Sequence, residues 1–506
     1  MKLEEGPEPG AALRRLTVCC GGFTLEAAGA ILEMQDRQAD VEALINTLRS
    51  WQFVTLQAAF NGHQGRYAID PLVIMGVGID ESAHQAHYDY YEALARQCRD
   101  AGDDSGLDAE LANLQAAFEW SLSKDVAAAY WLYNACSDYC IRRGHAGRNL
   151  DWVKRIAAVV REHPDQFLWG AVYNALGVAY QNHPMDRRRE NLWKAIEAYR
   201  LALEFHNPSD APLAHAVIQH NLGTAYADLA RLEDRADNLR RALGAYEQAL
   251  NYRTPPRGSH AYAATHNALG LAYRDLAGVE DRAANLRRAL AAYDEALRYF
   301  LPEEAPNEYA ATQNNVGNAY RDLAAVEDHA GNLRRAIDAY REALTYRTPR
   351  NAPLAYAATQ NNLGTAYRDL AGEENALKNL YRAVAAFEDA LRYYTPERSA
   401  HDYAAARNNL GSAYFALAHL EDEEDNLRRA VEAFEDALCH YSPASSPLDY
   451  AKTQANLGLA RRKMGDLPGA LTCWREAMLY FRQMGDMDTL NLVRGWMRRA
   501  DSTDTI

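Results

Sequence analysis

Asparagine is the residue with useful side-chain chemistry that recurs most regularly in this sequence. In the stretch ATQNNLGTAYRDLA, two adjacent asparagines precede a Leu-Gly step, and related stretches occur along much of the chain. The asparagines form two rows, the first with Asn267, Asn314, Asn361 and Asn408 and the second with Asn221, Asn315, Asn362, Asn409 and Asn456. An amide side chain offers two donors and an acceptor, which matches the backbone of an extended peptide. The rows predict a polar surface that binds a peptide backbone without requiring a particular side chain.

A row of arginines accompanies the first row of asparagines. Arg274, Arg321 and Arg368 recur with the same period as the asparagines, and an aspartate directly follows each of them. Guanidinium groups recognise carboxylates, so the arginines could select acidic side chains on a ligand. The neighbouring aspartates, Asp275, Asp322 and Asp369, would partly neutralise that selectivity.

Helical periodicity places these polar residues away from the core. On a helix, Val316 and Tyr320 share an apolar stripe, whereas Asn314, Asn315 and Asn318 lie on the opposite side. The asparagines are therefore predicted to be surface residues. Whether they contact a ligand stays open, because they could instead bond to neighbouring helices, and the repetition could reflect descent of every unit from one ancestor.

Other reactive residues do not form a recognisable catalytic or metal-binding pattern. His84 and His87 lie near acidic residues but have no clear third ligand, so they are interpreted as part of a solvated helix face. Cys19 and Cys20 lie in an apolar run typical of small core residues. The sequence also has no GxxxxGK[ST] loop to hold phosphates. We expect a protein that is not an enzyme and has no cofactor and no metal.

Composition argues against several classes of partner. The 506-residue chain has a formal net charge of -15 and few clusters of Lys and Arg, which disfavours nucleic acid and anionic membranes. The seven cysteines include no CxxC pair, as expected for reduced thiols. The first residues lack the apolar segment of a signal peptide. These features predict a soluble cytoplasmic protein.

The asparagines belong to a long internal repeat. A Leu-Gly or Val-Gly step recurs at Gly177, Gly223, Gly270, Gly317, Gly364, Gly411 and Gly458, first after 46 residues and then every 47. Each unit also has a small-aromatic-small pattern, such as Ala336, Tyr340 and Ala343, and a later proline that ends a helix. Each unit is therefore predicted to be a helical hairpin, and the series a solenoid.

The pattern Leu-Gly-x-x-Tyr, then Ala-x-x-x-Tyr/Phe-x-x-Ala, then Pro resembles the tetratricopeptide repeat (TPR). The usual TPR has about 34 residues, and the internal units here are predicted to have about seven more residues between the two helices, in runs such as VEDRAANL. The resemblance implies an all-α TPR superhelical solenoid of about seven or eight hairpins, whose first helices line a concave groove. The paired asparagines are also similar to the NNL step of kinesin light chain TPRs, whose groove binds peptides.

The residues before the repeat have a different pattern. Three short helices and two strand-like runs, 51–57 and 65–70, separated by the turn NGHQG, predict a small winged-helix domain. Thr24 is expected to cap the second helix, which should extend to about Met34. We expect a winged-helix-like domain at 1–78, a helical linker at 79–125, a degenerate first hairpin at 126–165, a TPR solenoid at 166–483, and a C-terminal capping helix and tail at 484–506.

The order of these segments resembles the part of bacterial STAND (NB-ARC-type) signal-transduction ATPases that follows the nucleotide-binding module. The resemblance implies a sensor arm that binds a protein or peptide and regulates an ATPase module in cis or in trans. Two features depart from the family, because the phosphate-binding loop is absent and Ile69, Asp70 and Pro71 stand where a Met-His-Asp step is common. A standalone adaptor that assembles a protein complex is the alternative. A winged-helix transcription regulator is disfavoured because Arg49 is the only strong cation on the third helix.

Overall fold

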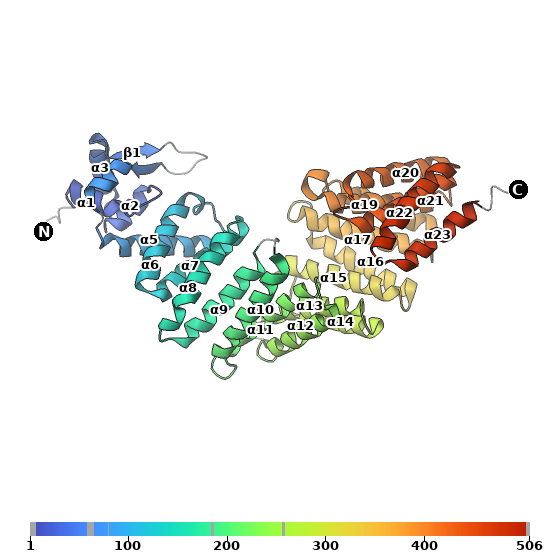
Figure 1. The fold of residues 1–506 in the computed structure, drawn as a ribbon, viewed down its shortest axis with the longest axis horizontal. Helices are drawn as coiled ribbons and strands as arrows, with labels where there is room; N and C mark the ends of the chain where they lie inside the picture. The colour runs from blue at the N-terminus through green and yellow to red at the C-terminus, as the bar shows by residue number, and fades with distance from the viewer. Residues whose placement is uncertain (1–6, 58–64, 79, 184–186, 256–258, 502–506) are drawn as a thin grey trace. The chain divides into compact units, whose positions relative to one another are not determined.

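The computed structural model describes residues 7–57, 65–78, 80–183, 187–255 and 259–501. Two compact units are present, Met1–Glu233 and Asp234–Ile506. Both are built almost entirely of helices (Figure 1).

The first unit begins with three helices and a two-stranded hairpin. These elements are α1 (Pro9–Leu16), α2 (Leu25–Ile31), α3 (Gln38–Ser50), β1 (Val54–Gln57) and β2 (Arg66–Ile69). The strands are antiparallel, with Val54 opposite Ile69. The predicted turn NGHQG lies mostly outside the described residues. Thr24 caps α2 as expected by accepting a hydrogen bond from the Ala27 N–H, but the helix ends at Ile31 because Glu33 adopts a left-handed conformation.

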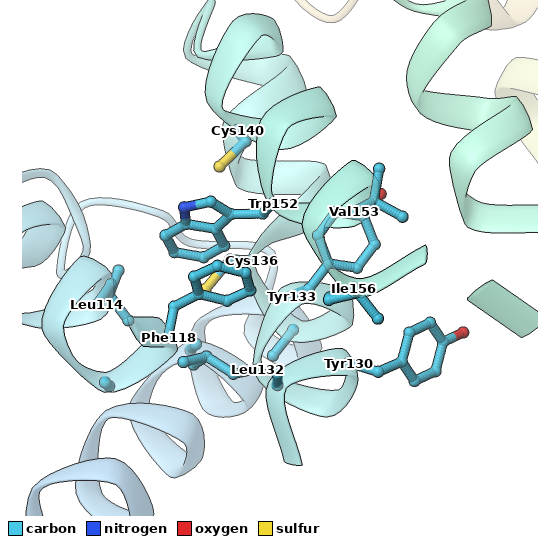
Figure 2. Close-up of a cluster of buried hydrophobic side chains, with 14 of the residues drawn as sticks. Leu114, Phe118, Tyr130, Leu132, Tyr133, Cys136, Cys140, Trp152, Val153 and Ile156 are labelled. Atoms are coloured by element: carbon cyan, nitrogen blue, oxygen red, sulfur yellow. The ribbon is translucent and has the colours of Figure 1, made fainter. Parts of the chain in front are cut away.

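Helices make up the rest of the first unit. They are α4 (Pro71–Val77), α5 (Ala83–Ala101), η1 (Asp108–Glu110), α6 (Leu111–Lys124), α7 (Val126–Arg142), α8 (Ala146–Val159), η2 (Val160–Glu162), α9 (Gln166–Gln181), α10 (Arg188–Phe205) and α11 (Pro212–Leu229). The core between α6, α7 and α8 is aromatic (Figure 2). The rings of Phe118 and Trp152 stack there, with centroids 4.4 Å apart.

A buried polar network connects the β-hairpin to α6. Arg66 forms an ion pair with Glu110 and donates to the carbonyls of Gly21 and Gly22 at 3.0 and 3.1 Å. The fully buried Asn113 donates to the Gly22 carbonyl at 2.8 Å and to Glu110 Oε2 at 2.7 Å. Because each of these buried groups has a partner, the network joins the N-terminal helices to the bundle that follows them.

Paired helices build the second unit. They are α12 (Arg235–Leu250), α13 (Ser259–Ala277), α14 (Arg282–Leu297), α15 (Pro306–Ala324), α16 (His329–Tyr346), α17 (Pro353–Ala371), α18 (Ala376–Leu391), α19 (Pro396–Leu417), α20 (Glu423–His440), α21 (Pro447–Lys463), α22 (Leu467–Gln483) and α23 (Met487–Asp501). From α13 to α22 each odd-numbered helix packs against the helix that follows it, and each even-numbered helix packs against the next pair (Figure 1). The odd-numbered members of these pairs are called first helices below, and the even-numbered members second helices.

The repeated glycine allows the two helices of a hairpin to approach closely. A Cβ atom added at Gly317 would lie 2.5 Å from the ring of Tyr340, and one added at Gly364 would lie 2.7 Å from the ring of Phe387. Both rings are fully buried. The same close approach occurs at Gly177, Gly270, Gly411 and Gly458. These Leu/Val-Gly steps therefore pair with the aromatic residue of the second landmark, which explains why the two recur together.

The extra residues of the internal units lengthen both helices. Helix α13 continues seven residues beyond Gly270, whereas α21 continues five beyond Gly458. Helix α14 begins seven residues before Ala289, whereas α22 begins three before Ala470. The connecting turn stays short, and a left-handed residue precedes each lengthened second helix of the second unit: Asp234, Asp281, Asp328, Asn375 and Asp422, with φ between 42° and 48°. Asp and Asn tolerate this conformation better than most residues.

Candidate functional site

The two rows of asparagines form hydrogen bonds with each other between consecutive repeats. Within the second compact unit, the Nδ2 of each second-row asparagine donates a hydrogen bond to the Oδ1 of the first-row asparagine in the preceding repeat. The pairs are Asn315–Asn267 at 3.1 Å, Asn362–Asn314 at 3.2 Å, Asn409–Asn361 at 3.0 Å and Asn456–Asn408 at 3.2 Å. We call these four pairs the asparagine ladder. In the first unit, Asn221 donates in the same way to Asn174 at 3.1 Å.

Each ladder bond leaves part of the amide group unused. The Nδ2 groups of Asn314, Asn361 and Asn408 donate no hydrogen bond within the described part of the chain, and the Oδ1 atoms of Asn315 and Asn362 accept none there. All of these side chains are partly exposed. The ladder therefore holds a series of donors and acceptors in fixed orientations on the first helices.

The arginine row is largely paired with aspartate. Arg274 Nε lies 3.4 Å from an Asp322 carboxylate oxygen, and Arg368 Nη2 lies 2.9 Å from Asp369. Arg321 Nη2 lies 3.9 Å from Asp322. The arginines and aspartates are all about one-quarter to one-third exposed, with side-chain values between 26% and 33%. Because the aspartates neutralise the arginines, the polar face presents mainly neutral amide groups to solvent.

Asn318 contacts the hairpin core. It accepts a hydrogen bond from the buried Tyr340 hydroxyl at 2.8 Å. The equivalent position in the preceding unit is Leu271, and the Tyr293 hydroxyl there is buried without a partner. Asn318 therefore satisfies a buried hydroxyl whose counterpart in the preceding repeat has no partner, and its side chain is partly exposed.

A second series of contacts joins each of three second helices to the turn of the following repeat. Three arginines of second helices each pair with a glutamate in the turn between the two helices of the next repeat: Arg240, Arg287 and Arg334. Their Nε atoms lie 3.3, 3.3 and 3.1 Å from Glu280, Glu327 and Glu374, respectively. We call these pairs the arginine–glutamate ladder. Two other donors occupy the same position, because Trp193 donates to Glu233 and Tyr381 donates to Glu421.

Two of the sequence-based interpretations are wrong, because His87 is buried rather than solvated and Cys20 is exposed rather than a core residue, whereas Cys19 is buried as predicted. His84 stacks on Trp120, and burial lowers the pKa of His87 to about 4. Burial also raises the pKa of the Cys19 thiol well above its usual range, which disfavours the reactive thiolate. No group of three or more potential ligands (His, Cys, Asp or Glu) is placed to hold a metal ion among the residues that the structure describes. None of the helices described is both long enough and apolar enough to cross a membrane.

Comparison with known proteins identifies the fold. No family model matches the chain, and no curated protein matches it. A STAND protein with a tetratricopeptide repeat sensor from Pyrococcus horikoshii is similar in structure, with a TM-score of 0.60 and 13% identity over 97% of this chain and 66% of that chain. This chain therefore spans about two thirds of that protein's length.

Two further solved structures have lower TM-scores. The quorum sensor NprR from B. thuringiensis has a TM-score of 0.47 and 12% identity, covering 79% of this chain and 99% of that chain. BtubC from P. vanneervenii has a TM-score of 0.36 and 21% identity, covering 49% of this chain and 92% of that chain. At 13% identity, the likeness to the P. horikoshii protein concerns the fold. The structural neighbours are TPR proteins, and this chain has the all-α fold of a TPR solenoid.

Proposed function

We propose that this chain is a non-enzymatic sensor arm that binds a protein or peptide along the asparagine ladder and regulates a STAND-type ATPase module. The observation that carries the proposal is the set of unused amide groups on the first helices. Donors at Asn314, Asn361 and Asn408 alternate with acceptors at Asn315 and Asn362, as backbone C=O and N–H groups alternate along an extended peptide.

Mutual bonding of the asparagines favours this role. A side chain that is already held in one orientation loses less conformational entropy when a ligand binds. The ladder therefore ties the units together and at the same time prepares the remaining donors and acceptors. Arg274, Arg321 and Arg368 border the ladder, but their pairing with aspartates favours a neutral peptide segment over an acidic one. The proposed ligand-binding residues also include Asn221, Asn267, Asn318 and Asn409.

Fold-level likeness supports the sensor role. The similarity to the STAND protein extends over 97% of this chain, including the N-terminal helices and hairpin, so it is not confined to the repeats. The winged-helix assignment of residues 1–78 and the presence of an ATPase partner belong to the same proposal. The adaptor alternative differs only in lacking that partner.

A selection experiment tests the binding surface. Peptides selected from a random displayed library against the full chain are measured by calorimetry against the wild type and against the triple variant Asn314→Ala, Asn361→Ala and Asn408→Ala. Each lost contact removes about 1 kcal/mol, so the affinity should fall roughly a hundredfold. The matched control replaces by Ala three exposed asparagines outside the ladder: Asn251 in a turn, Asn307 in the first turn of α15 and Asn491 in α23. Equal affinity for the ladder variant and the wild type, at a temperature where both are folded, would contradict the proposal.

A further inference from the structure

One junction in the second unit breaks the charge pattern of the repeat. The second helices have an acidic residue at the equivalent positions Glu247, Asp294, Glu388 and Glu435, but α16 has Arg341 there. Lys378 is also exceptional, because its equivalents are Asp237, Ala284, Gly331 and Asp425. Both replacements add positive charge at the same junction, between α16 and α18.

At three of the other four junctions the acidic residue binds a group of the following first helix, and only Asp294 has no such bond among the described residues. Tyr273 donates to Glu247 at 3.3 Å, and Tyr414 donates to Glu388 at 3.0 Å. Arg461 takes the place of the tyrosine in the last unit and donates to Glu435 at 2.7 Å. These junctions are therefore internally paired.

The junction at Tyr367 lacks this acceptor. The Arg341 guanidinium lies over the Tyr367 ring at 5.6 Å from its centroid, and the Arg382 guanidinium also lies 5.6 Å from it. The Tyr367 hydroxyl makes no hydrogen bond within the described part of the chain. Arg341, Lys378 and Arg382 likewise make no ion pair there. Two guanidinium groups on one ring repel each other, and an anion between them would relieve that repulsion.

A hollow of about 230 Å³ lies at this junction, and Arg334, Arg341, Lys378 and Arg382 line it together with Asp338 and Glu374. Glu374 already pairs with Arg334, which leaves three cations facing one carboxylate. The corresponding charges beside Tyr414 are neutralised, because Glu388 accepts the hydrogen bond of the tyrosine hydroxyl and Asp425 pairs with Arg429.

We infer that the hollow around Tyr367 binds a phosphate monoester. A phosphate monoester carries nearly two negative charges at neutral pH and has three acceptor oxygens. Guanidinium groups and a phenolic hydroxyl are suitable donors for those oxygens. A single carboxylate would leave excess positive charge unpaired. The volume also suffices for a phosphate group, since one water molecule occupies about 30 Å³ in the liquid.

Ligand-observed NMR titration of the full chain tests this site. The probes are an acetylated Ala-phosphoserine-Ala tripeptide and glycerol 3-phosphate, with the unphosphorylated tripeptide as a blank. Both phosphorylated probes should bind saturably at one site. Tighter binding of the tripeptide would assign the site to phosphorylated proteins, and equal binding would assign it to small phosphomonoesters. Absence of saturable binding would overturn the inference.

Variants with matched charge separate a specific site from general attraction. Arg341→Glu restores the acidic character of the equivalent positions and should weaken binding at least roughly tenfold. Arg350→Glu makes the same charge change at an exposed loop residue and should leave binding unchanged. Equal weakening by both variants would refute the site.

A gain-of-function variant completes the test. The double variant Glu388→Arg and Asp425→Lys places beside Tyr414 the same three cationic groups that surround Tyr367, because the Arg429 guanidinium already lies 5.6 Å from the Tyr414 ring centroid. This variant should bind two phosphate groups per chain, and a stoichiometry of one would count against the inference. The hollow uses none of the ladder asparagines, so failure of peptide binding at the ladder would leave this result unaffected.

Discussion

The asparagine ladder and the arginine–glutamate ladder both join consecutive repeats within the second compact unit, but they use different chemistry. The asparagine pairs are neutral, partly buried and leave donors and acceptors unused. The arginine–glutamate pairs are charged, and their arginine side chains are 53% to 60% exposed. Solvent and salt screen exposed ion pairs, whereas a partly buried amide pair is screened much less. A periodic contact is therefore not equally important for stability on every surface of a solenoid.

Both ladders depend on close packing within each hairpin, and breaking that packing should have the largest effect. Gly317→Val should destabilise the chain by about 3 kcal/mol or more, because its Cβ would collide with the buried Tyr340 ring. The free energy of unfolding in urea measures this loss.

Gly244→Ala is the control for the glycine substitution. Gly244 lies inside α12 with open space around it, so alanine should stabilise the helix by up to about 1 kcal/mol. If Gly317→Val were as stable as the wild type, the close approach of the helices would not be needed for the fold.

Removing the asparagine ladder should have the next largest effect on stability. The variant with Ala at Asn314, Asn361 and Asn408 loses three bonds between units, each contributing about 0.5–1 kcal/mol, or about 2 kcal/mol together. Because no charge is involved, the loss should be the same at low and high salt. A loss that disappears in high salt would show that the ladder acts through the neighbouring Arg and Asp residues instead.

Removing the arginine–glutamate ladder should have the smallest effect. The variant with Ala at Arg240, Arg287 and Arg334 should be less destabilised than the asparagine variant, and the difference from the wild type should vanish in high salt. Thermal unfolding at low and high ionic strength measures the difference.

The same variant also has a defined pH dependence. Hydrogen bonding to Arg334 lowers the pKa of Glu374 below its usual value. A carboxylate with a lowered pKa in the folded state contributes stability above its unfolded pKa, which is about 4.3, and this contribution is lost as the pH falls through the folded value. The variant and the wild type should therefore converge in acid. A difference that persists there would show that the arginines act by packing rather than by charge.

Local patterns in the sequence located most of the elements. The strands predicted at 51–57 and 65–70 correspond to Val54–Gln57 and Arg66–Ile69, and the capping helix expected within 484–506 corresponds to Met487–Asp501. The extra residues of the internal units were placed between the helices by the sequence landmarks, whereas the structure uses most of them to lengthen both helices. Periodicity gives the distance between landmarks but does not show where a helix ends.

The helical hairpin, its period and the polar face of the first helices were all predictable from the amino-acid sequence. These features follow from helical periodicity and from the regular spacing of the glycine and aromatic landmarks along the chain. Only the tertiary structure decided that Asn362 bonds to Asn314 and that Arg341 faces Tyr367 without a carboxylate. Those contacts depend on the separation and relative rotation of consecutive repeats. Many small packing interactions between the helices of neighbouring repeats set that geometry.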